Sequence, residues 1–128
     1  MAAAQPRRSV LVIEDEQDTR DMYVVLLGQS GFDVATARTG TEGFTRACEI
    51  RPNLILTDLG LPSLDGWEVI RRLKADTRTK QIPVVVITGR STPELHDVAA
   101  KLGCASLLTK PCIPDDLINE IERTLVTR

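Results

Sequence analysis

Short, largely apolar runs alternate along the chain with segments that show helical periodicity. Four of these runs, at 10–13, 54–57, 84–87 and 107–109, are rich in valine, leucine and isoleucine, and a weaker one covers 33–37. Strands that alternate with helices predict βαβ units and a mostly parallel sheet. Because right-handed crossovers place helices on both faces of such a sheet, its central strands should be apolar throughout, as the first three of the four runs are.

Capping residues, prolines and glycines mark the ends of the predicted helices. Thr92 and Pro93 can open one helix that Gly103 closes, and Asp65 can cap another. The expected strands are 9–13, 33–37, 54–57, 84–87 and 107–109, and the expected helices are 17–29, 41–50, 65–75, 93–102 and 114–125. We expect residues 1–8 to be a flexible N-terminal tail and residues 9–128 to form one α/β domain.

Polar residues that packing does not require stand at the ends of the apolar runs. They are Glu14 and Asp15, Asp58, Thr88 and Lys110. The carboxyl ends of parallel strands meet at one edge of a sheet, where ligands bind. Three carboxylates gathered there repel one another, by about 4 kcal/mol per pair at ~4 Å and an effective dielectric of ~20. A bound Mg²⁺ relieves that repulsion, and a carboxylate is a competent nucleophile for phosphoryl transfer.

Composition limits the classes of function. The chain has 128 residues and a net charge of -2, so no basic field favours direct binding of nucleic acid. No apolar stretch approaches the ~20 residues of a membrane span, and we expect no membrane insertion. The three cysteines form neither a CxxC pair nor an even framework, which favours a cytoplasmic protein with reduced thiols.

The segments LVIEDE, LILTDLGLPSLDGWE, VVVITG and LLTKP occur in this order and resemble the receiver domain of two-component response regulators. The resemblance covers nearly the whole chain and is nearest to stand-alone, chemotaxis-type receivers. It implies a flavodoxin-like (βα)5 doubly wound parallel sheet with strand order 2-1-3-4-5. No output segment follows the last expected helix, so we expect either a stand-alone receiver or a piece of a longer protein.

The resemblance also implies roles for the polar residues at the strand ends. Asp58 is the implied phosphoacceptor, Thr88 the hydroxyl that responds to phosphorylation, and Lys110 the cation that contacts the phosphoryl group. The Lys110-Pro111 peptide bond is implied to be cis. The implied cofactor is Mg²⁺, held by Glu14, Asp15, Asp58 and the backbone carbonyl of Gly60.

A receiver of this kind is a Mg²⁺-dependent switch rather than an enzyme with an external substrate. It accepts a phosphoryl group from a sensor histidine kinase or a histidine phosphotransfer protein, and it catalyses only its own phosphorylation and dephosphorylation. Relatives pass the signal to a downstream protein through the face formed by the fourth helix, the fifth strand and the fifth helix.

Three residues near the expected site differ from the usual pattern or vary within the family. Leu107 occupies the position where receivers usually carry tyrosine or phenylalanine, so the usual aromatic coupling is not expected. Gly89 keeps the site open, and Arg90 could fold over the phosphate or pair with Glu14. We therefore assign Leu107, Gly89 and Arg90 to switching and to the lifetime of the phosphorylated state.

Three alternatives remain. A phosphatase of the haloacid-dehalogenase type needs a second aspartate two residues after the first, where this chain has Gly60. A flavodoxin-type FMN carrier needs a hydroxyl- and glycine-rich phosphate cradle after the first strand, where this chain has Glu14-Asp15-Glu16. The third is a degenerate receiver that binds proteins without being phosphorylated, which Leu107 leaves possible. Turnover of a phosphate ester would identify the phosphatase, and a yellow colour would identify the FMN carrier. Failure of the protein to become phosphorylated would identify the degenerate receiver.

Overall fold

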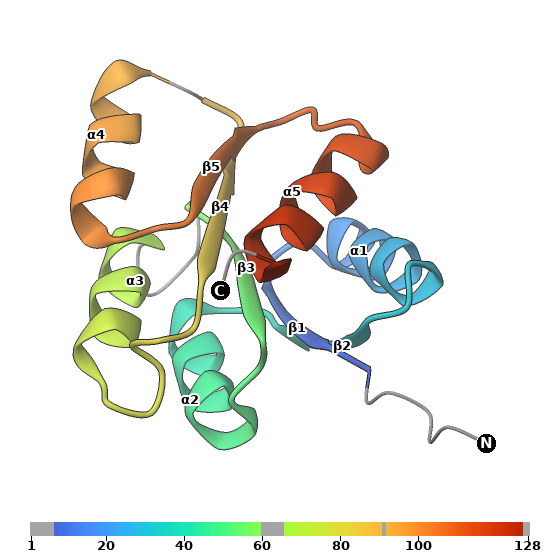
Figure 1. Ribbon diagram of the computed structural model, residues 1–128, viewed down its shortest axis with the longest axis horizontal. Coiled ribbons are helices and arrows are strands. Elements are labelled where there is room, and N and C mark those ends of the chain that lie inside the picture. The colour runs from blue at the N-terminus through green and yellow to red at the C-terminus, as the bar shows by residue number, and fades with distance from the viewer. Residues whose placement is uncertain (1–6, 60–65, 91, 127–128) are drawn as a thin grey trace.

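The computed structural model describes residues 7–59, 66–90 and 92–126, in which strands and helices alternate strictly (Figure 1). The strands are β1 (Ser9–Ile13), β2 (Asp33–Ala37), β3 (Leu54–Asp58), β4 (Val84–Thr88) and β5 (Ser106–Thr109). The helices are α1 (Gln17–Gln29), α2 (Gly40–Ile50), α3 (Gly66–Ala75), α4 (Pro93–Leu102) and α5 (Pro114–Val126). Among these helices, none is both long enough and apolar enough to cross a membrane.

All five strands pair in parallel in one sheet, in the order β2-β1-β3-β4-β5. Helices α1 and α5 cover one face of the sheet, and α2, α3 and α4 lie on the other (Figure 1). The predicted flavodoxin-like architecture and its strand order are confirmed.

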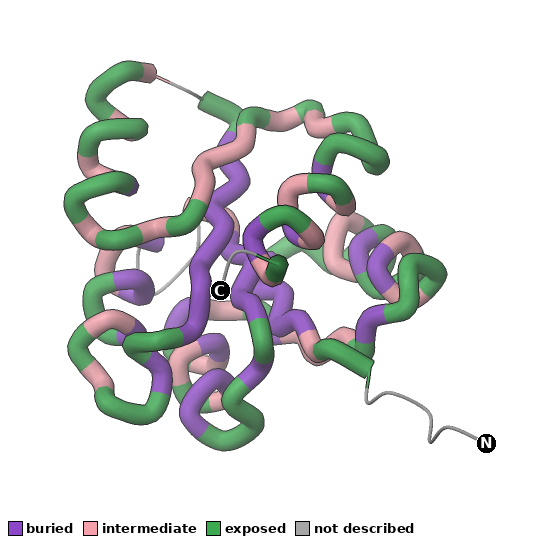
Figure 2. The backbone as a smooth tube through the Cα atoms, viewed as in Figure 1, coloured by how far each residue is buried: buried purple, intermediate pink, exposed green. Residues whose placement is uncertain are grey.

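The central strands are apolar throughout because each contributes side chains to two cores. In β1, Leu11 and Ile13 pack with α2 and α3, whereas Val10 and Val12 pack with α1 and α5. Burial follows the same pattern, since β4 is buried along its whole length while the edge strands β2 and β5 are largely only half-buried (Figure 2). A strand covered on both sides must be apolar at every position, and this explains the unbroken runs in the sequence.

Element ends differ from the predicted ones by one residue at several places. Asp58 and Thr88 are the last residues of β3 and β4 rather than the first residues beyond them, and β5 begins at Ser106. Helix α2 begins at Gly40 because the Thr39 hydroxyl caps it by accepting from the backbone N–H of Glu42. The predicted cap of the third helix, Asp65, lies outside the described residues.

Arg7 and Arg8, which we expected in a flexible tail, contact the domain. The Arg7 guanidinium donates hydrogen bonds to the carbonyl oxygens of Gly28 (3.2 Å) and Phe32 (3.0 Å), and it pairs with Asp33 at 3.3 Å. The Arg8 guanidinium lies 5.3 Å from the centroid of the Phe32 ring. These two residues therefore hold the start of β1 against the end of α1, because a cation near a helix C-terminus satisfies carbonyls that have no partner within the helix.

The register of the sheet aligns the strand ends. Ile13 of β1 is opposite Thr57 of β3, and Asp58 is opposite Ile87, the residue before Thr88. The residues that follow Ile13 and those that end β3 and β4 therefore lie at the same edge of the sheet, as the sequence predicts.

Gly66, at the start of α3, lies against the backbone that follows Asp58. A Cβ atom at this position would come within 2.5 Å of Leu59 Cα and 2.9 Å of the carbonyl oxygen of Asp58. Backbone atoms cannot move away as the end of a flexible side chain can, so this close approach requires glycine.

We predict that Gly66→Ala lowers the free energy of unfolding by about 1–3 kcal/mol, the usual cost of overpacking. Gly28→Ala is the matched control because a Cβ in this part of α1 would meet nothing within 4 Å. It should raise stability by about 0.5–1 kcal/mol, since alanine favours a helix over glycine. Urea denaturation measures both, and equal stability of the two variants would contradict the prediction.

Candidate functional site

Three charged side chains from different strand ends meet at the carboxyl edge of the sheet. Asp58 ends β3, Glu14 follows β1 directly, and Lys110 follows β5 directly. The Lys110 ammonium forms an ion pair with Asp58 Oδ2, and its Nζ lies 3.4 Å from Glu14 Oε1. The site therefore joins residues that are 52 and 96 positions apart in the chain.

The backbone of Lys110 is tied to the neighbouring strand. Its N–H donates to the carbonyl oxygen of Thr88 at 2.7 Å, and the Lys110-Pro111 peptide bond that follows is cis, as the resemblance implies. The lysine side chain is 33% exposed and the Asp58 side chain only 13% exposed. The ammonium thus covers a carboxylate that is largely withdrawn from water.

Glu14 is the most deeply buried carboxylate of the site, with 2% of its surface exposed. Burial raises its pKa, although a hydrogen bond from the backbone N–H of Glu16 (3.1 Å) opposes the shift. The neighbouring Asp15 carboxyl raises the pKa further, Lys110 lowers it, and Asp58 raises it again. The pKa is raised mainly because the carboxylate is buried, with the neighbouring carboxyls adding to the effect.

The pKa of Lys110 is raised as well, but for a lysine this favours the charged form. Burial disfavours its charged form, but the hydrogen bond to Asp58 and the charges of Asp58 and Glu14 outweigh burial and raise the pKa of the ammonium. Lys110 therefore stays charged at neutral pH, as it must in order to balance the negative charge of the carboxylates.

The carboxylates also provide the oxygen ligands that Mg²⁺ prefers. Within the described ranges, no three His, Cys, Asp or Glu side chains are grouped closely enough to hold a metal by themselves. The predicted cluster of three carboxylates differs from this arrangement because Lys110 lies between Glu14 and Asp58, while Asp15 is exposed. Mg²⁺ needs only one or two carboxylates and takes its other ligands from water and substrate. The donor set therefore fits Mg²⁺; the remaining predicted ligand, the Gly60 carbonyl, lies outside the described residues.

The residues predicted to control switching lie at the end of β4, in the segment that follows it and within β5. Thr88 is 8% exposed, and its Oγ1 accepts a hydrogen bond from the backbone N–H of Arg90 at 3.2 Å. The Arg90 side chain is exposed and takes part in none of the ion pairs found among the described residues. Of the two possibilities for Arg90, pairing with Glu14 is not observed, and Glu14 pairs with Lys110. A Cβ at Gly89 would meet nothing within 4 Å, and Leu107 packs half-buried against the core on the α2 and α3 face.

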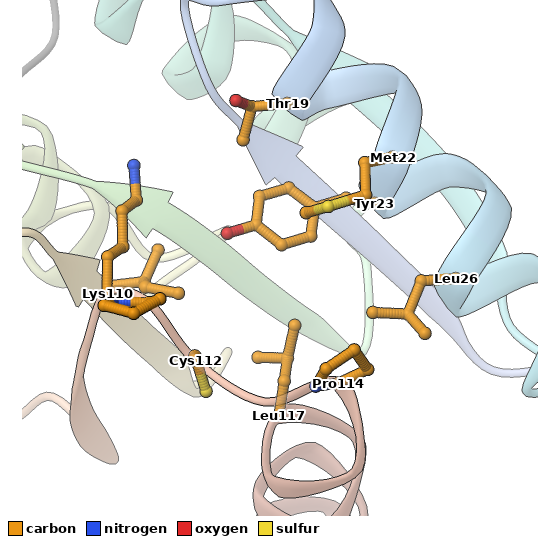
Figure 3. A pocket seen from close by; sticks show the side chains of 10 residues that line it. Thr19, Met22, Tyr23, Leu26, Lys110, Cys112, Pro114 and Leu117 are labelled. Atoms are coloured by element: carbon orange, nitrogen blue, oxygen red, sulfur yellow. The ribbon is translucent and has the colours of Figure 1, made fainter.

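Two further residues at the site were not singled out from the sequence. Arg20 of α1 donates to the carbonyl oxygens of Glu14 (3.0 Å) and Asp15 (3.3 Å) and so holds the loop that carries both carboxylates. Tyr23 is 4% exposed and lines a cavity of about 480 Å³ together with Lys110 (Figure 3). Burial raises the pKa of Tyr23 to about 12, against the opposing effect of Lys110. Both residues lie on α1, where the sequence pattern shows only a helix.

Comparison with known proteins agrees with the fold and the order of the motifs. A family model described as the response regulator receiver domain matches residues 10–122. The chain is 34% identical over 118 residues to the phosphate regulon transcriptional regulatory protein PhoB of Escherichia coli strain K12, which covers 92% of this chain and 52% of that protein. It is 31% identical over 119 residues to the DNA-binding response regulator MtrA of Mycolicibacterium paratuberculosis, with 93% and 52% covered. The chain thus spans about half the length of these curated relatives.

Solved structures show the same architecture. The chemotaxis response regulator CheY4 of Vibrio cholerae is similar with a TM-score of 0.87 and 26% identity, covering 93% of this chain and 99% of that one. The receiver domain of the sensor histidine kinase PA1611 from Pseudomonas aeruginosa PAO1, described with a magnesium ion coordinated in its active site cleft, has a TM-score of 0.86 and 22% identity. That match covers 94% of this chain and 98% of the other.

We predict that Glu14→Gln stabilises the metal-free protein at pH 7 by on the order of 1 kcal/mol, a usual size for one substitution. The pKa of Glu14 lies above its ordinary value of 4.5 in the folded protein, so the folded state binds the extra proton. Stability from this group therefore falls as pH rises above that value, and glutamine removes the loss. The gain should vanish near pH 4, where glutamic acid is protonated in both states.

Urea denaturation in the presence of a chelator, at both pH values, measures the difference. Glu94→Gln serves as the control, because Glu94 is an exposed residue in the first turn of α4. Destabilisation of Glu14→Gln at pH 7 would contradict the prediction.

Proposed function

We propose that this chain, which belongs to the response regulator receiver domain family, is a Mg²⁺-dependent phosphoacceptor switch whose phosphoryl group is carried by Asp58. The observation that carries the proposal is the position of Asp58 at the end of a central strand, paired with Lys110 and beside Glu14. A nucleophilic carboxylate, a cation for the phosphoryl oxygens and acidic metal ligands at one edge of the sheet are the parts that phosphoryl transfer to aspartate requires.

The proposed reaction uses residues of this chain in distinct roles. An oxygen of Asp58 attacks the phosphorus of a phosphohistidine, the phosphorus–nitrogen bond breaks, and the imidazole leaves with the electron pair of that bond. Lys110 compensates negative charge on the phosphoryl oxygens, and Thr88 donates its hydroxyl to one of them. Water later hydrolyses the acyl phosphate, so the protein modifies itself and is not an enzyme with an external substrate.

Mg²⁺, when bound, neutralises charge on the transferred group. We propose that it is held by Glu14, Asp15 and Asp58 with the backbone carbonyl of Gly60. Arg20 supports this loop through the carbonyl oxygens of Glu14 and Asp15. Leu107 replaces the usual aromatic residue, so in our proposal the hydroxyl of Thr88 carries the conformational response without an aromatic partner.

The proposed partners are a sensor histidine kinase or a histidine phosphotransfer protein as donor, and a downstream protein as receiver of the signal. We propose that the downstream protein contacts α4, β5 and α5, where Ser106 donates to Glu120 at 2.6 Å and Glu120 pairs with Arg123. The relative MtrA is described as DNA-binding, and that description applies to MtrA alone. With a net charge of -2, we propose that this domain does not itself bind nucleic acid. Its three free thiols suit the cytoplasm.

We predict that the protein gains one phosphoryl mass when it is incubated with Mg²⁺ and acetyl phosphate, and that Asp58→Asn does not. Intact-mass spectrometry measures the gain, and omission of Mg²⁺ should abolish it because the acidic site then repels the phosphodonor. An adduct in both proteins would place the phosphoryl group elsewhere. No adduct in the wild type, with Mg²⁺ binding confirmed, would favour a degenerate receiver that works as a protein-binding module.

We predict that Arg90→Ala shortens the lifetime of the phosphorylated state by up to about fivefold, since an exposed charge contact contributes at most ~1 kcal/mol. The backbone N–H of Arg90 donates a hydrogen bond to Thr88 Oγ1. From this position its guanidinium can shield the phosphoryl group from water. Decay of the phosphorylated mass over time measures the lifetime. Arg72→Ala, an exposed arginine of α3 that pairs with Glu68, is the control. An unchanged lifetime would remove Arg90 from the mechanism.

A further inference from the structure

Lys110 and the proposed metal draw on the same carboxylates, and the inference that follows therefore rests on the proposed function. The ammonium pairs with both Asp58 and Glu14. A divalent cation that shares these carboxylates repels the ammonium and competes for their oxygen atoms. Lys110 must therefore lose at least part of its present pairing when Mg²⁺ binds, and it needs another acceptor on the same side of the site.

The cavity next to Lys110 offers few acceptors. Its walls come from α1, the end of β4 and the segment that leads into α5, and they are mostly apolar, with Met22, Leu26 and Leu117 among them (Figure 3). Thr19 supplies one hydroxyl, which donates its proton to Glu16 Oε1 at 2.6 Å and can still accept a hydrogen bond through its oxygen. Tyr23 supplies the other.

The Tyr23 hydroxyl is placed to reach into this space. The ring is buried in the core between α1 and α5, and the hydroxyl points across the cavity toward the side from which Lys110 projects (Figure 3). Within the part of the chain that the structure describes, no hydrogen bond to this hydroxyl is found. The ring is buried, but the hydroxyl opens into the cavity, so its oxygen can accept a hydrogen bond from a lysine that lines the same cavity.

We propose that Tyr23 is a positioning residue: its hydroxyl oxygen accepts a hydrogen bond from the Lys110 ammonium when Mg²⁺ occupies the carboxylates. A phenolic oxygen can accept while its proton is donated to water in the cavity, and an ammonium has three protons to place. The contact keeps the lysine at the edge of the site, ready for the phosphoryl oxygens, instead of releasing it to solvent. Lys110 and Tyr23 also affect each other's pKa, as expected for groups that share one cavity.

The test is a double-mutant cycle on Mg²⁺ affinity. Tyr23→Phe, which removes only the hydroxyl, should weaken Mg²⁺ binding measured by titration calorimetry by about fivefold, the effect of one hydrogen bond of intermediate strength. The same substitution made in Lys110→Met should leave the affinity unchanged, because the donor is gone. Thr19→Val, which removes the other hydroxyl of the cavity, should not reproduce the effect of Tyr23→Phe.

A second measurement does not require the lysine variant to fold. Tyr23 is the single tyrosine of the chain, so ¹³Cζ labelling of tyrosine gives one NMR signal. That signal should shift on addition of Mg²⁺ to the wild-type protein, and the shift should saturate with the calorimetric affinity. An unmoved signal, or an equal loss of affinity from Tyr23→Phe in both lysine backgrounds, would overturn the positioning role. Failure of the wild type to bind Mg²⁺ at all would instead overturn the proposed function and the inference with it.

Discussion

The ammonium of Lys110, held between the carboxylates of Asp58 and Glu14, is the interaction on which the site depends. It links the ends of β1, β3 and β5. Among the described contacts at this edge, Lys110 supplies the one positive charge that pairs with these carboxylates. Removing one partner of a fully buried ion pair costs about 3–5 kcal/mol because the other charge is left uncompensated. Lys110 is 33% exposed, so water reduces that cost here, but Glu14 at 2% exposure has little access to water.

The parallel sheet makes this interaction possible through its register. Because Ile13 is opposite Thr57 and Asp58 is opposite Ile87, the residues after these positions share one edge. The backbone N–H of Lys110 bonds to the carbonyl oxygen of Thr88 and carries the alignment to the last strand. A slip of one residue would exchange the side chains of the two cores and disturb the packing of both, so the buried cores on the two sides of the sheet also hold the charged groups in place.

How much of the structure can be predicted from the sequence depends on how far apart in the chain the contacting residues are. Strands, helices and the placement of Asp58 follow from short-range patterns and from the common edge of parallel strands. The binding of Arg7 to carbonyls 21 to 25 residues away does not, because nothing local distinguishes a tail arginine from one that caps a helix. Tyr23 occupies an ordinary apolar position of a helix, and only the folded chain shows that it lines the same cavity as Lys110.

Charge balance explains why the site would hold a divalent metal in addition to lysine as counter-ion. Glu14, Asp15 and Asp58 with Lys110 carry a formal charge of -2 when all are ionised. The raised pKa of Glu14 comes first from burial and is increased by the neighbouring carboxyls, against the lysine and the backbone hydrogen bond. One divalent cation cancels the excess, whereas a second lysine would not. In the proposed switch, relief of this repulsion would favour binding of Mg²⁺ and would leave the lysine available for the phosphoryl group.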